Sequence, residues 1–414
     1  MNIILFSQFY YPERIAAAFR ATSNARLWSS IGHRVTVFTT FPNYPTGRIF
    51  EGYSPKLLSI EQDGQITVLR SKIKVVPNTS TLKRIINGSS FLIWGLVNIL
   101  FQRKKIISDY DVVIGSSGIV FTGTLAWLFA KRQHIPFVFE IRDITFRQLI
   151  ATGSAPESIK VKLMKRMELK LCKKAKAVVV VTNGFKDDLV AEGIEPEKIH
   201  VITNGAELYE EKMLHLETSK VAIGYFGTFG ISQGIIEVIK TVEAAHKVIS
   251  SLELLLVGEG AEKTKVDSYL AKKNYQFIRI LPSMPLEQLE SYYKQICLGI
   301  ASLRNTPDFK NTIPSKIFQI MARGIPVLYI GCDGEAASIL RTYNAGIVLT
   351  GSLEKNQESL QAFFQRDDWS QQLEEMGQNG QNAVNEHFDR SLLANHYAMV
   401  LENLALSKRK LIDN

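Results

Sequence analysis

The sequence holds few cysteines, and those it holds are scattered. Cys172, Cys297 and Cys332 are far apart in the chain and form no C-x-x-C pair. A disulfide framework needs cysteines in pairs, and a structural zinc site needs ligands at close spacing. The sequence therefore predicts neither, and it favours a reducing compartment.

Long apolar runs are also missing. The longest, at residues 91–101, is well short of the roughly 20 residues that span a bilayer. The N-terminal segment MNIILF has no basic region and no cleavage site, so we interpret it as a buried strand and not as a signal peptide. We expect a cytoplasmic protein without a transmembrane helix.

Charge is divided unevenly along the chain. Residues 1–205 contain 28 lysines and arginines against 15 aspartates and glutamates, whereas the formal net charge of all 414 residues is only +9. A basic half indicates an anionic partner, such as nucleic acid, a phospholipid surface or a phosphorylated substrate. We expect no nucleic acid, because the basic residues come without a recognised module or interleaved aromatics.

Short apolar runs rich in β-branched residues alternate with helical stretches, which is typical of buried parallel strands joined by crossover helices. The runs that predict strands lie at residues 3–6, 35–39, 66–69, 112–114, 137–139, 177–181, 221–225, 254–257, 277–280, 299–301, 327–330 and 347–349. The rhythm restarts after residue 205. The sequence therefore predicts an α/β protein with two doubly wound parallel sheets in tandem.

The two sheets define the expected domains. The first covers residues 1–205 and the second covers residues 221–388. Residues 206–220 lack strand character and carry several charges, so we predict a linker there. By analogy with folds of this kind, residues 389–414 are expected to form a helix that packs back on the first domain.

The strongest local pattern is PSKIFQIMARGIPV at residues 314–327. It predicts a short helix that opens at Lys316, ends at Gly324 and leads into a buried strand. Free amides at a helix start favour an anion, and the lysine adds a full positive charge. The same pattern also fits a helix–turn–strand connection that binds no ligand.

Two strands of the second domain end in glycine-rich turns. YFGTFGISQG at residues 225–234 precedes a helix, and LLVGEG at residues 255–260 ends the next strand. Glycine lets the backbone approach a ligand closely, and parallel strands bring their carboxyl ends to one edge of a sheet. Each turn alone is equally explained by tight packing, but several at one edge indicate one binding site.

Together these stretches resemble the second domain of retaining glycosyltransferases of family 4, which have the GT-B architecture. Within that family they are most similar to bacterial enzymes of surface-polysaccharide (O-antigen, capsule) synthesis. The first-domain segments that share the resemblance are YYPE at 10–13, GHRVTV at 32–37, PNYP at 42–45, EIRD at 140–143 and ITNG at 202–205. The resemblance implies two Rossmann-like domains facing each other across a cleft.

The resemblance also implies an activity, in which a sugar is transferred from a nucleotide-sugar to a polyprenyl-diphosphate-linked saccharide with retention of the anomeric configuration. The expected donor is a UDP-sugar. It implies no metal and no cofactor. The implied catalytic residues are Lys316, Asn311 and Asp143. The implied donor-binding residues are Gly227, Thr228, Gln233, Gly234, Gly258, Gly260, Arg304, Lys310, Ser315, Lys316 and Gln319. The implied acceptor-side residues are Tyr11, Glu13 and Arg142.

The glycine turn departs from the family pattern in its charge. The family commonly has G-R-x-x-x-x-K-G, whose Arg and Lys grip the donor diphosphate, but Thr228 and Gln233 stand at these positions. We expect the neighbouring cations Arg304, Lys310 and Lys316 to replace the two lost charges.

A second departure concerns two glutamates that the family carries eight residues apart before M-A-x-G. Asn311 and Gln319 replace them here. Amides can hydrogen-bond hydroxyls, but they cannot stabilise positive charge on a sugar ring as carboxylates can. An alternative hypothesis is therefore a catalytically degenerate GT-B subunit that binds nucleotide and a partner. A sugar-nucleotide epimerase of similar architecture fits the PSKIF and GHRVTV patterns less well.

The first domain carries two further candidates. Glu140, Arg142 and Asp143 follow a predicted strand and would position the acceptor or a proton, or form a structural ion pair. The apolar run at 91–101 lies between basic residues, and a second basic stretch covers 158–176. Such helices can lie on an anionic membrane surface, or simply pack in the core with a solvated basic face. We expect a protein peripheral to the inner face of the plasma membrane.

Overall fold

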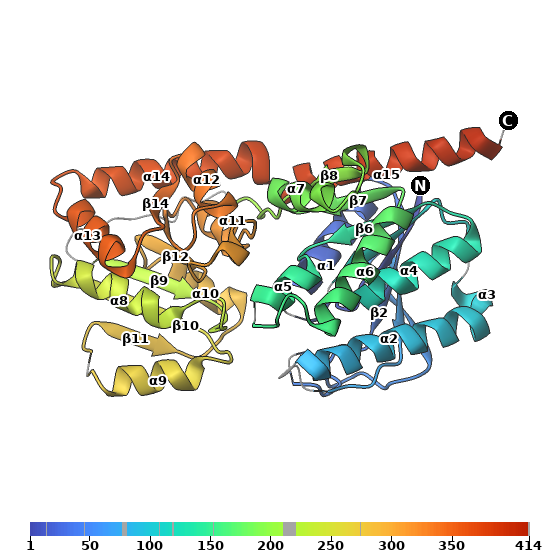
Figure 1. Cartoon of the computed structure of the whole chain (residues 1–414), viewed down its shortest axis with the longest axis horizontal. Coiled ribbons are helices and arrows are strands. Elements are labelled where there is room, and N and C mark those ends of the chain that lie inside the picture. The colour runs from blue at the N-terminus through green and yellow to red at the C-terminus, as the bar shows by residue number, and fades with distance from the viewer. Residues whose placement is uncertain are drawn as a thin grey trace. The chain divides into compact units, whose positions relative to one another are not determined.

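The structure, a computed structural model, describes residues 1–412 except 14, 45, 77–80, 107, 118–119, 152, 210–220 and 274. It contains two compact units, Met1–Thr203 with Ser391–Asn414, and Asn204–Arg390 (Figure 1). Most of the predicted linker lies outside the described residues. Its described part, 206–209, is held on the second unit, where Ala206 forms a β-bridge with Asp389.

The first unit is built on an eight-stranded sheet of order β3-β4-β2-β1-β5-β6-β7-β8. Its strands are β1 (Asn2–Phe6), β2 (Arg34–Thr40), β3 (Leu58–Asp63), β4 (Ile66–Ser71), β5 (Val112–Ser117), β6 (Phe137–Ile141), β7 (Ala177–Val180) and β8 (Ile199–Val201). The six strands expected here are confirmed. Two strands were not predicted: β8, which has three residues, and β3, a half-exposed edge strand that pairs antiparallel with β4. The sheet is therefore parallel except at this edge.

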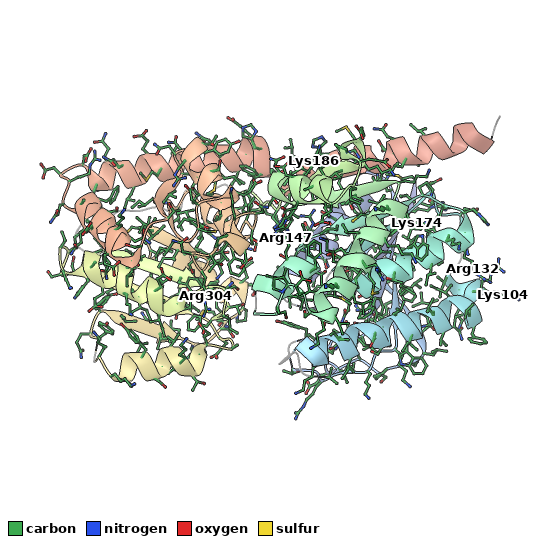
Figure 2. The ribbon with its side chains drawn as sticks, viewed as in Figure 1. Lys104, Arg132, Arg147, Lys174, Lys186 and Arg304 are labelled. Carbon is green, nitrogen blue, oxygen red and sulfur yellow. The ribbon has the colours of Figure 1, made fainter. Side chains whose placement is uncertain are left out.

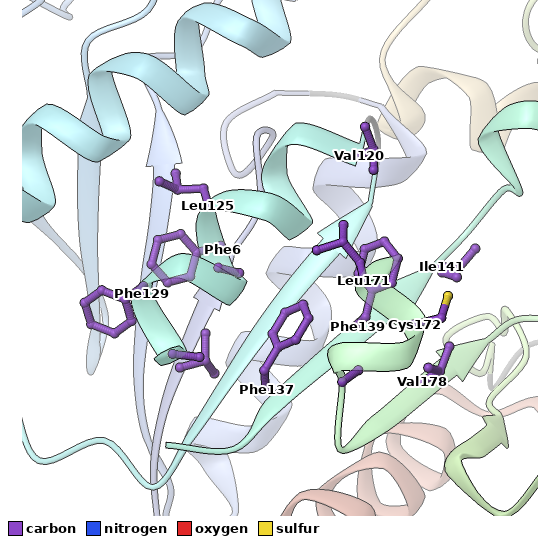
Figure 3. Close-up of a cluster of buried hydrophobic side chains, with 14 of the residues drawn as sticks. Phe6, Val120, Leu125, Phe129, Phe137, Phe139, Ile141, Leu171, Cys172 and Val178 are labelled. Atoms are coloured by element: carbon purple, nitrogen blue, oxygen red, sulfur yellow. The ribbon is translucent and has the colours of Figure 1, made fainter. Parts of the chain in front are cut away.

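Helices cover both faces of this sheet. They are α1 (Ala16–Ser30), α2 (Thr81–Phe101), α3 (Arg103–Ile106), α4 (Val120–Gln133), α5 (Thr145–Ala151), α6 (Ile159–Lys174), α7 (Asn183–Ala191), the 3₁₀ turn η1 (Pro196–Lys198) and α15 (Arg390–Ile412). One face packs against α2, α4 and α6 around Phe6, Phe129 and Phe139, which Figure 3 shows. Alternate residues of the same strands point to the other face, because side chains alternate along a strand.

The opposite face packs against α1 and the C-terminal helix. Trp28 and Tyr397 are fully buried there, with ring centroids 5.2 Å apart, and Trp28 Nε1 donates to Ala394 O at 3.1 Å. The last helix of the chain therefore completes this core of the first unit, which also contains residues of β1, β2 and β5.

The second unit has a six-stranded, fully parallel sheet of order β11-β10-β9-β12-β13-β14. Its strands are β9 (Ala222–Phe226), β10 (Glu253–Val257), β11 (Ile278–Leu281), β12 (Leu298–Ser302), β13 (Val327–Ile330) and β14 (Gly346–Leu349). All six were predicted. The order reverses between β9 and β12, and in open parallel sheets ligands bind at the carboxyl ends of strands beside such a point.

Helices cover both faces of the second sheet as well. They are α8 (Ile235–His246), α9 (Lys263–Ala271), α10 (Leu286–Tyr293), the 3₁₀ turn η2 (Pro307–Phe309), α11 (Lys316–Met321), α12 (Glu335–Thr342), α13 (Leu353–Phe364), α14 (Trp369–Ala383) and the π-helical turn η3 (Val384–Phe388). One core contains residues of α8, α9 and α13, and the other contains residues of α10, α11 and α12.

Candidate active site

The two glycine-rich turns of the second unit are joined by backbone hydrogen bonds. The amides of Gly227 and Phe229 each donate to a carbonyl of residues 257–259 at 2.8 Å. A Cβ on Gly258 would lie 1.9 Å from the Gly227 oxygen, and one on Gly260 would lie 2.5 Å from the Phe229 oxygen. Contact between the turns therefore requires both glycines. The Gly227 and Phe229 amides already donate hydrogen bonds between the turns.

Lys316 lies at the edge of this paired turn. It opens α11 as predicted, and its side chain runs against Gly227, where an added Cβ would lie 2.3 Å from Lys316 Nζ. The ammonium lies 3.8 Å from the ring centroid of Tyr225, a buried residue whose hydroxyl donates to Thr228 O at 2.7 Å. Burial lowers the pKa of Lys316 to about 7.

The other two cations expected near this turn have different surroundings. Arg304 packs beside Gly234, and its guanidinium lies 3.5 Å from Glu262 Oε1. Lys310 has an exposed side chain, and its carbonyl accepts from the Glu335 amide at 2.9 Å. Of the three cations expected to replace the missing charges of the glycine turn, Lys316 is the one that the structure shows in contact with Gly227.

Arg304 and Gly234 line a pocket of about 540 Å³ on the α8 side of the sheet. The other residues that line it are Ile236, Glu237, Lys240, Glu262, Lys265, Asn305, Thr306 and Leu353. Lys316 and Gly227 are not part of this lining. The pocket and the lysine are therefore two distinct features of the carboxyl edge.

The remaining donor-side residues have mainly local partners. Gln233 belongs to its own turn, since Ser232 Oγ donates to Gln233 Oε1 at 3.1 Å and Ser302 Oγ donates to its carbonyl at 2.8 Å. Ser315 stands before α11 without capping it through its side chain. The half-buried Gln319 lies one turn into α11, and Asn311, also half-buried, lies in the segment before that helix.

A buried cluster that the sequence analysis missed fixes α11 from its other end. Arg323 is 2% exposed, donates to Gln319 O and to Glu290 Oε2 at 3.0 Å, and lies over the rings of Tyr209 and Tyr293 at 4.0 and 4.2 Å. Because Glu290, Tyr209 and Tyr293 come from other segments, only the fold brings the cluster together. It anchors the helix that carries Lys316.

Two acceptor-side candidates of the first unit lie in the loop after β1. Glu13 is buried, and its Oε1 accepts from the amides of Asn43 and Tyr44 at 2.9 and 3.0 Å. Burial raises the pKa of Glu13 in spite of these hydrogen bonds. Tyr11 is 52% exposed and carries Arg26 over its ring at 5.0 Å. Glu13 therefore joins two loops, whereas Tyr11 is open to a ligand.

The EIRD segment covers the end of β6 and the two residues after it, and an ion pair joins it to another element. Glu140 is buried and forms an ion pair with Arg20 at 2.7 Å. Burial raises its pKa, but the charges of Arg20 and Arg142 outweigh this effect, so the pKa is lowered overall. Arg142 donates to the carbonyls of Ala17 and Ala16 at 3.1 and 3.0 Å, and Asp143 is exposed.

A second buried carboxyl that the sequence analysis missed supports this segment. Glu168 of α6 is 0% exposed, and its Oε1 accepts from the amide and hydroxyl of Thr145 at 3.1 and 2.8 Å. It thereby caps the first turn of α5. Burial raises the pKa of Glu168 to about 7.

In the parts of the chain that the structure describes, no group of three or more His, Cys, Asp or Glu side chains is arranged to hold a metal ion. One Asp-x-Asp sequence is present, at Asp109 and Asp111. Both residues lie just before β5, and Asp111 Oδ2 accepts from the Asn2 amide at 2.8 Å. This pair lies at the amino end of the first sheet, away from the carboxyl edge where parallel sheets bind ligands.

Two family models match the chain. Residues 16–205 match the glycosyl transferase 4-like domain, and residues 220–365 match glycosyl transferases group 1. Together they span most of both units. The chain belongs to the GT-B glycosyltransferases.

Curated relatives of this glycosyltransferase include WcaI of Escherichia coli (strain K12), named as a colanic acid biosynthesis glycosyl transferase. It is 25% identical over 342 residues, which cover 78% of this chain and 82% of the relative. A GDP-mannose:cellobiosyl-diphosphopolyprenol alpha-mannosyltransferase of Xanthomonas oryzae pv. oryzae (strain PXO99A) is 27% identical over 132 residues, 30% of this chain and 35% of the relative.

Solved structures share the GT-B fold over nearly the whole glycosyltransferase. A sucrose-phosphate synthase from Thermosynechococcus elongatus has a TM-score of 0.73 at 14% identity and covers 98% of this chain and 100% of its own. WaaG, a glycosyltransferase of lipopolysaccharide biosynthesis, has a TM-score of 0.67 at 14% identity, with coverages of 97% and 99%. Anabaena HepE in complex with UDP and glucose has a TM-score of 0.66 at 13% identity, and the match covers 97% of this chain and 100% of HepE.

Proposed function

We propose that this glycosyltransferase moves a sugar, with retention, from a nucleotide-sugar to a polyprenyl-diphosphate-linked saccharide during bacterial surface-polysaccharide synthesis. The observation that supports donor binding is the position of the Lys316 ammonium, which lies against Gly227 at the carboxyl edge of the second sheet. Structural neighbours were solved with UDP and with UDP-glucose, and one relative is named for a diphosphopolyprenol acceptor.

Lys316 is the group that would stabilise the departing diphosphate. A fixed ammonium in a partly desolvated site stabilises developing negative charge more than a mobile one in water does. Thr228 and Gln233 bring no charge to this turn, so the lysine takes the role that the family gives to an Arg and a Lys. Under this proposal the diphosphate is neutralised by the protein without a metal ion.

A surface of the first unit supports the proposed membrane-bound acceptor. Helices α2, α4 and α6 pack side by side, and as crossover helices of parallel strands they all end at the amino edge of the sheet. The exposed cations at these ends are Arg103, Lys104, Lys105, Lys131, Arg132, Lys173 and Lys174, three of which Figure 2 labels. We call this set the basic end.

Exposed apolar side chains adjoin the basic end. Phe101 is 76% exposed, Leu100 is 55% exposed and Ile93 of the same helix is 58% exposed. Cations next to exposed apolar groups fit an anionic bilayer interface, where the apolar groups insert and the cations contact headgroups. Within the described residues, every helix is too short or too polar to cross a membrane. We propose peripheral attachment to the inner face of the plasma membrane.

The transfer reaction is tested with purified protein, a panel of UDP-, GDP- and dTDP-sugars, and polyprenyl-diphosphate-sugar acceptors. Nucleotide release and the mass shift of the lipid report transfer, and NMR of the product reports the anomeric configuration. We expect one donor to give product, and Lys316→Ala to reduce kcat by about 100-fold or more. Lys272→Ala, an exposed lysine after α9, is the matched control.

The outcome separates the two hypotheses for this chain. Product that Lys316→Ala abolishes and Lys272→Ala leaves intact supports the transferase. Tight nucleotide binding without product across the panel would favour the degenerate subunit, with Asn311 and Gln319 as its explanation.

Membrane attachment is tested by sedimentation with vesicles of phosphatidylglycerol and phosphatidylcholine. We expect binding that rises with the anionic fraction, falls with salt, and is lost in Lys104→Glu/Arg132→Glu. Lys272→Glu/Lys273→Glu, two exposed lysines of the second unit, is the charge-matched control. Equal binding of the double variant and the control would refute the proposed surface.

A further inference from the structure

We propose that Tyr225 is a positioning residue for Lys316, which it holds at Gly227 through its aromatic ring. The catalytic consequence of this inference rests on the proposed function, whereas the contact itself does not. The lysine and the tyrosine come from α11 and β9, which are about 90 residues apart in the sequence.

The ring of Tyr225 forms one wall of the ammonium site. Lys316 Nζ lies 3.8 Å from the ring centroid, well inside the distance of about 6 Å at which a ring attracts a cation. The lysine stem is long and flexible, and an ammonium is strongly hydrated, so without a partner it would extend into water. The ring supplies the attraction that keeps it at the turn.

Gly227 forms the opposite wall. Its φ of +147° is one that side-chain-bearing residues rarely adopt, and an added Cβ would lie 2.2 Å from Lys316 Cε. The absence of a side chain at Gly227 is therefore what admits the lysine. The Tyr225 hydroxyl fixes this wall as well, because it donates to Thr228 O in the same turn at 2.7 Å.

Tyr329 provides a matched control on the same sheet. It is equally buried near the end of β13, and its hydroxyl donates to Cys332 O at 3.2 Å, again three residues further along the chain. A substitution at Tyr329 therefore reproduces the loss of a buried ring and a turn hydrogen bond, while the ring under Lys316 stays intact.

The contact is tested by pulsed acetylation with acetic anhydride from pH 6 to pH 10, followed by mass spectrometry of the Lys316 peptide. Wild type and Tyr225→Phe are expected to show half-maximal reactivity near pH 7. In Tyr225→Leu the ammonium is released into water, so the midpoint should rise by at least about one pH unit. Tyr329→Leu should behave as wild type. A folded Tyr225→Leu with an unchanged midpoint would overturn the proposal.

The catalytic consequence is tested with the donor that the panel identifies. We expect Tyr225→Leu to lower kcat about 10-fold to 30-fold with a smaller change in KM, and Tyr225→Phe to keep kcat within about 3-fold of wild type. A shifted acetylation midpoint in a wild-type protein that transfers no sugar would refute the proposed function but not the contact. If the wild type transfers sugar but the acetylation midpoint of Tyr225→Leu is unshifted, the contact would be refuted and the proposed function would stand.

Discussion

Gly258→Ala tests the joined turns on which the candidate site depends. The added Cβ would lie 1.9 Å from the backbone oxygen of Gly227 and 2.8 Å from Phe229 Cε1. Carbon and oxygen atoms without a bond between them normally stay more than about 3 Å apart, so the two turns must separate by about 1 Å. A backbone oxygen cannot rotate away as the end of a side chain can.

The loss of folding stability in Gly258→Ala follows from the contacts that this separation of the two turns would break. The Gly227 and Phe229 amides would lose or weaken two hydrogen bonds of 2.8 Å to residues 257–259, each worth about 1 kcal/mol. The fully buried Phe229 ring must also shift, and overpacking a core costs about 1–3 kcal/mol. We expect Gly258→Ala to destabilise the second unit by about 3–5 kcal/mol.

Scanning calorimetry is the assay, because two units can unfold in separate transitions. The transition of the second unit should move down by roughly 10 °C or more while that of the first unit stays in place. Gly230→Ala is the control, since its Cβ would meet the movable end of the Gln233 side chain at 2.5 Å. Equal melting of the two variants would refute the argument that backbone contact between the turns requires glycine.

Three further results are expected. Because the charged form of Lys316 is lost above its pKa of about 7, kcat/KM for the donor should fall up to about tenfold per pH unit above pH 7, and Lys316→Arg should flatten that profile. Glu168 has a folded pKa of about 7, above its ordinary 4.5, so its contribution to stability is complete below pH 4.5 and is lost as pH rises through 7. This loss is about 3 kcal/mol, and Glu168→Gln should remove it from melting curves recorded between pH 5 and pH 8. Glu140→Ala removes the buried carboxylate that pairs with the half-buried Arg20 and should cost about 3–5 kcal/mol in urea unfolding, much of which Glu140→Leu/Arg20→Met should restore.

The sequence determined the fold class of this protein and the strand ends at which its candidate site lies. Strands buried on both faces must be continuous apolar runs, so each central strand was visible from its own residues. Lys316 at the start of α11 followed from local helix signals in the same way. The edge strand β3 was missed because an edge strand that is half-exposed alternates polar and apolar residues and gives no such run.

The tertiary structure decided what each candidate residue contacts. Arg304 and Lys310 are close to Lys316 in sequence, yet the turn geometry directs Arg304 toward Glu262 and leaves Lys310 exposed. Glu13 joins two loops, and Gly258 and Gly260 serve the contact between two turns. Such contacts link residues far apart in the chain, and no local pattern encodes them. The contacts of Lys316 with Tyr225 and Gly227 have the same origin, because only the tertiary fold brings the three residues together.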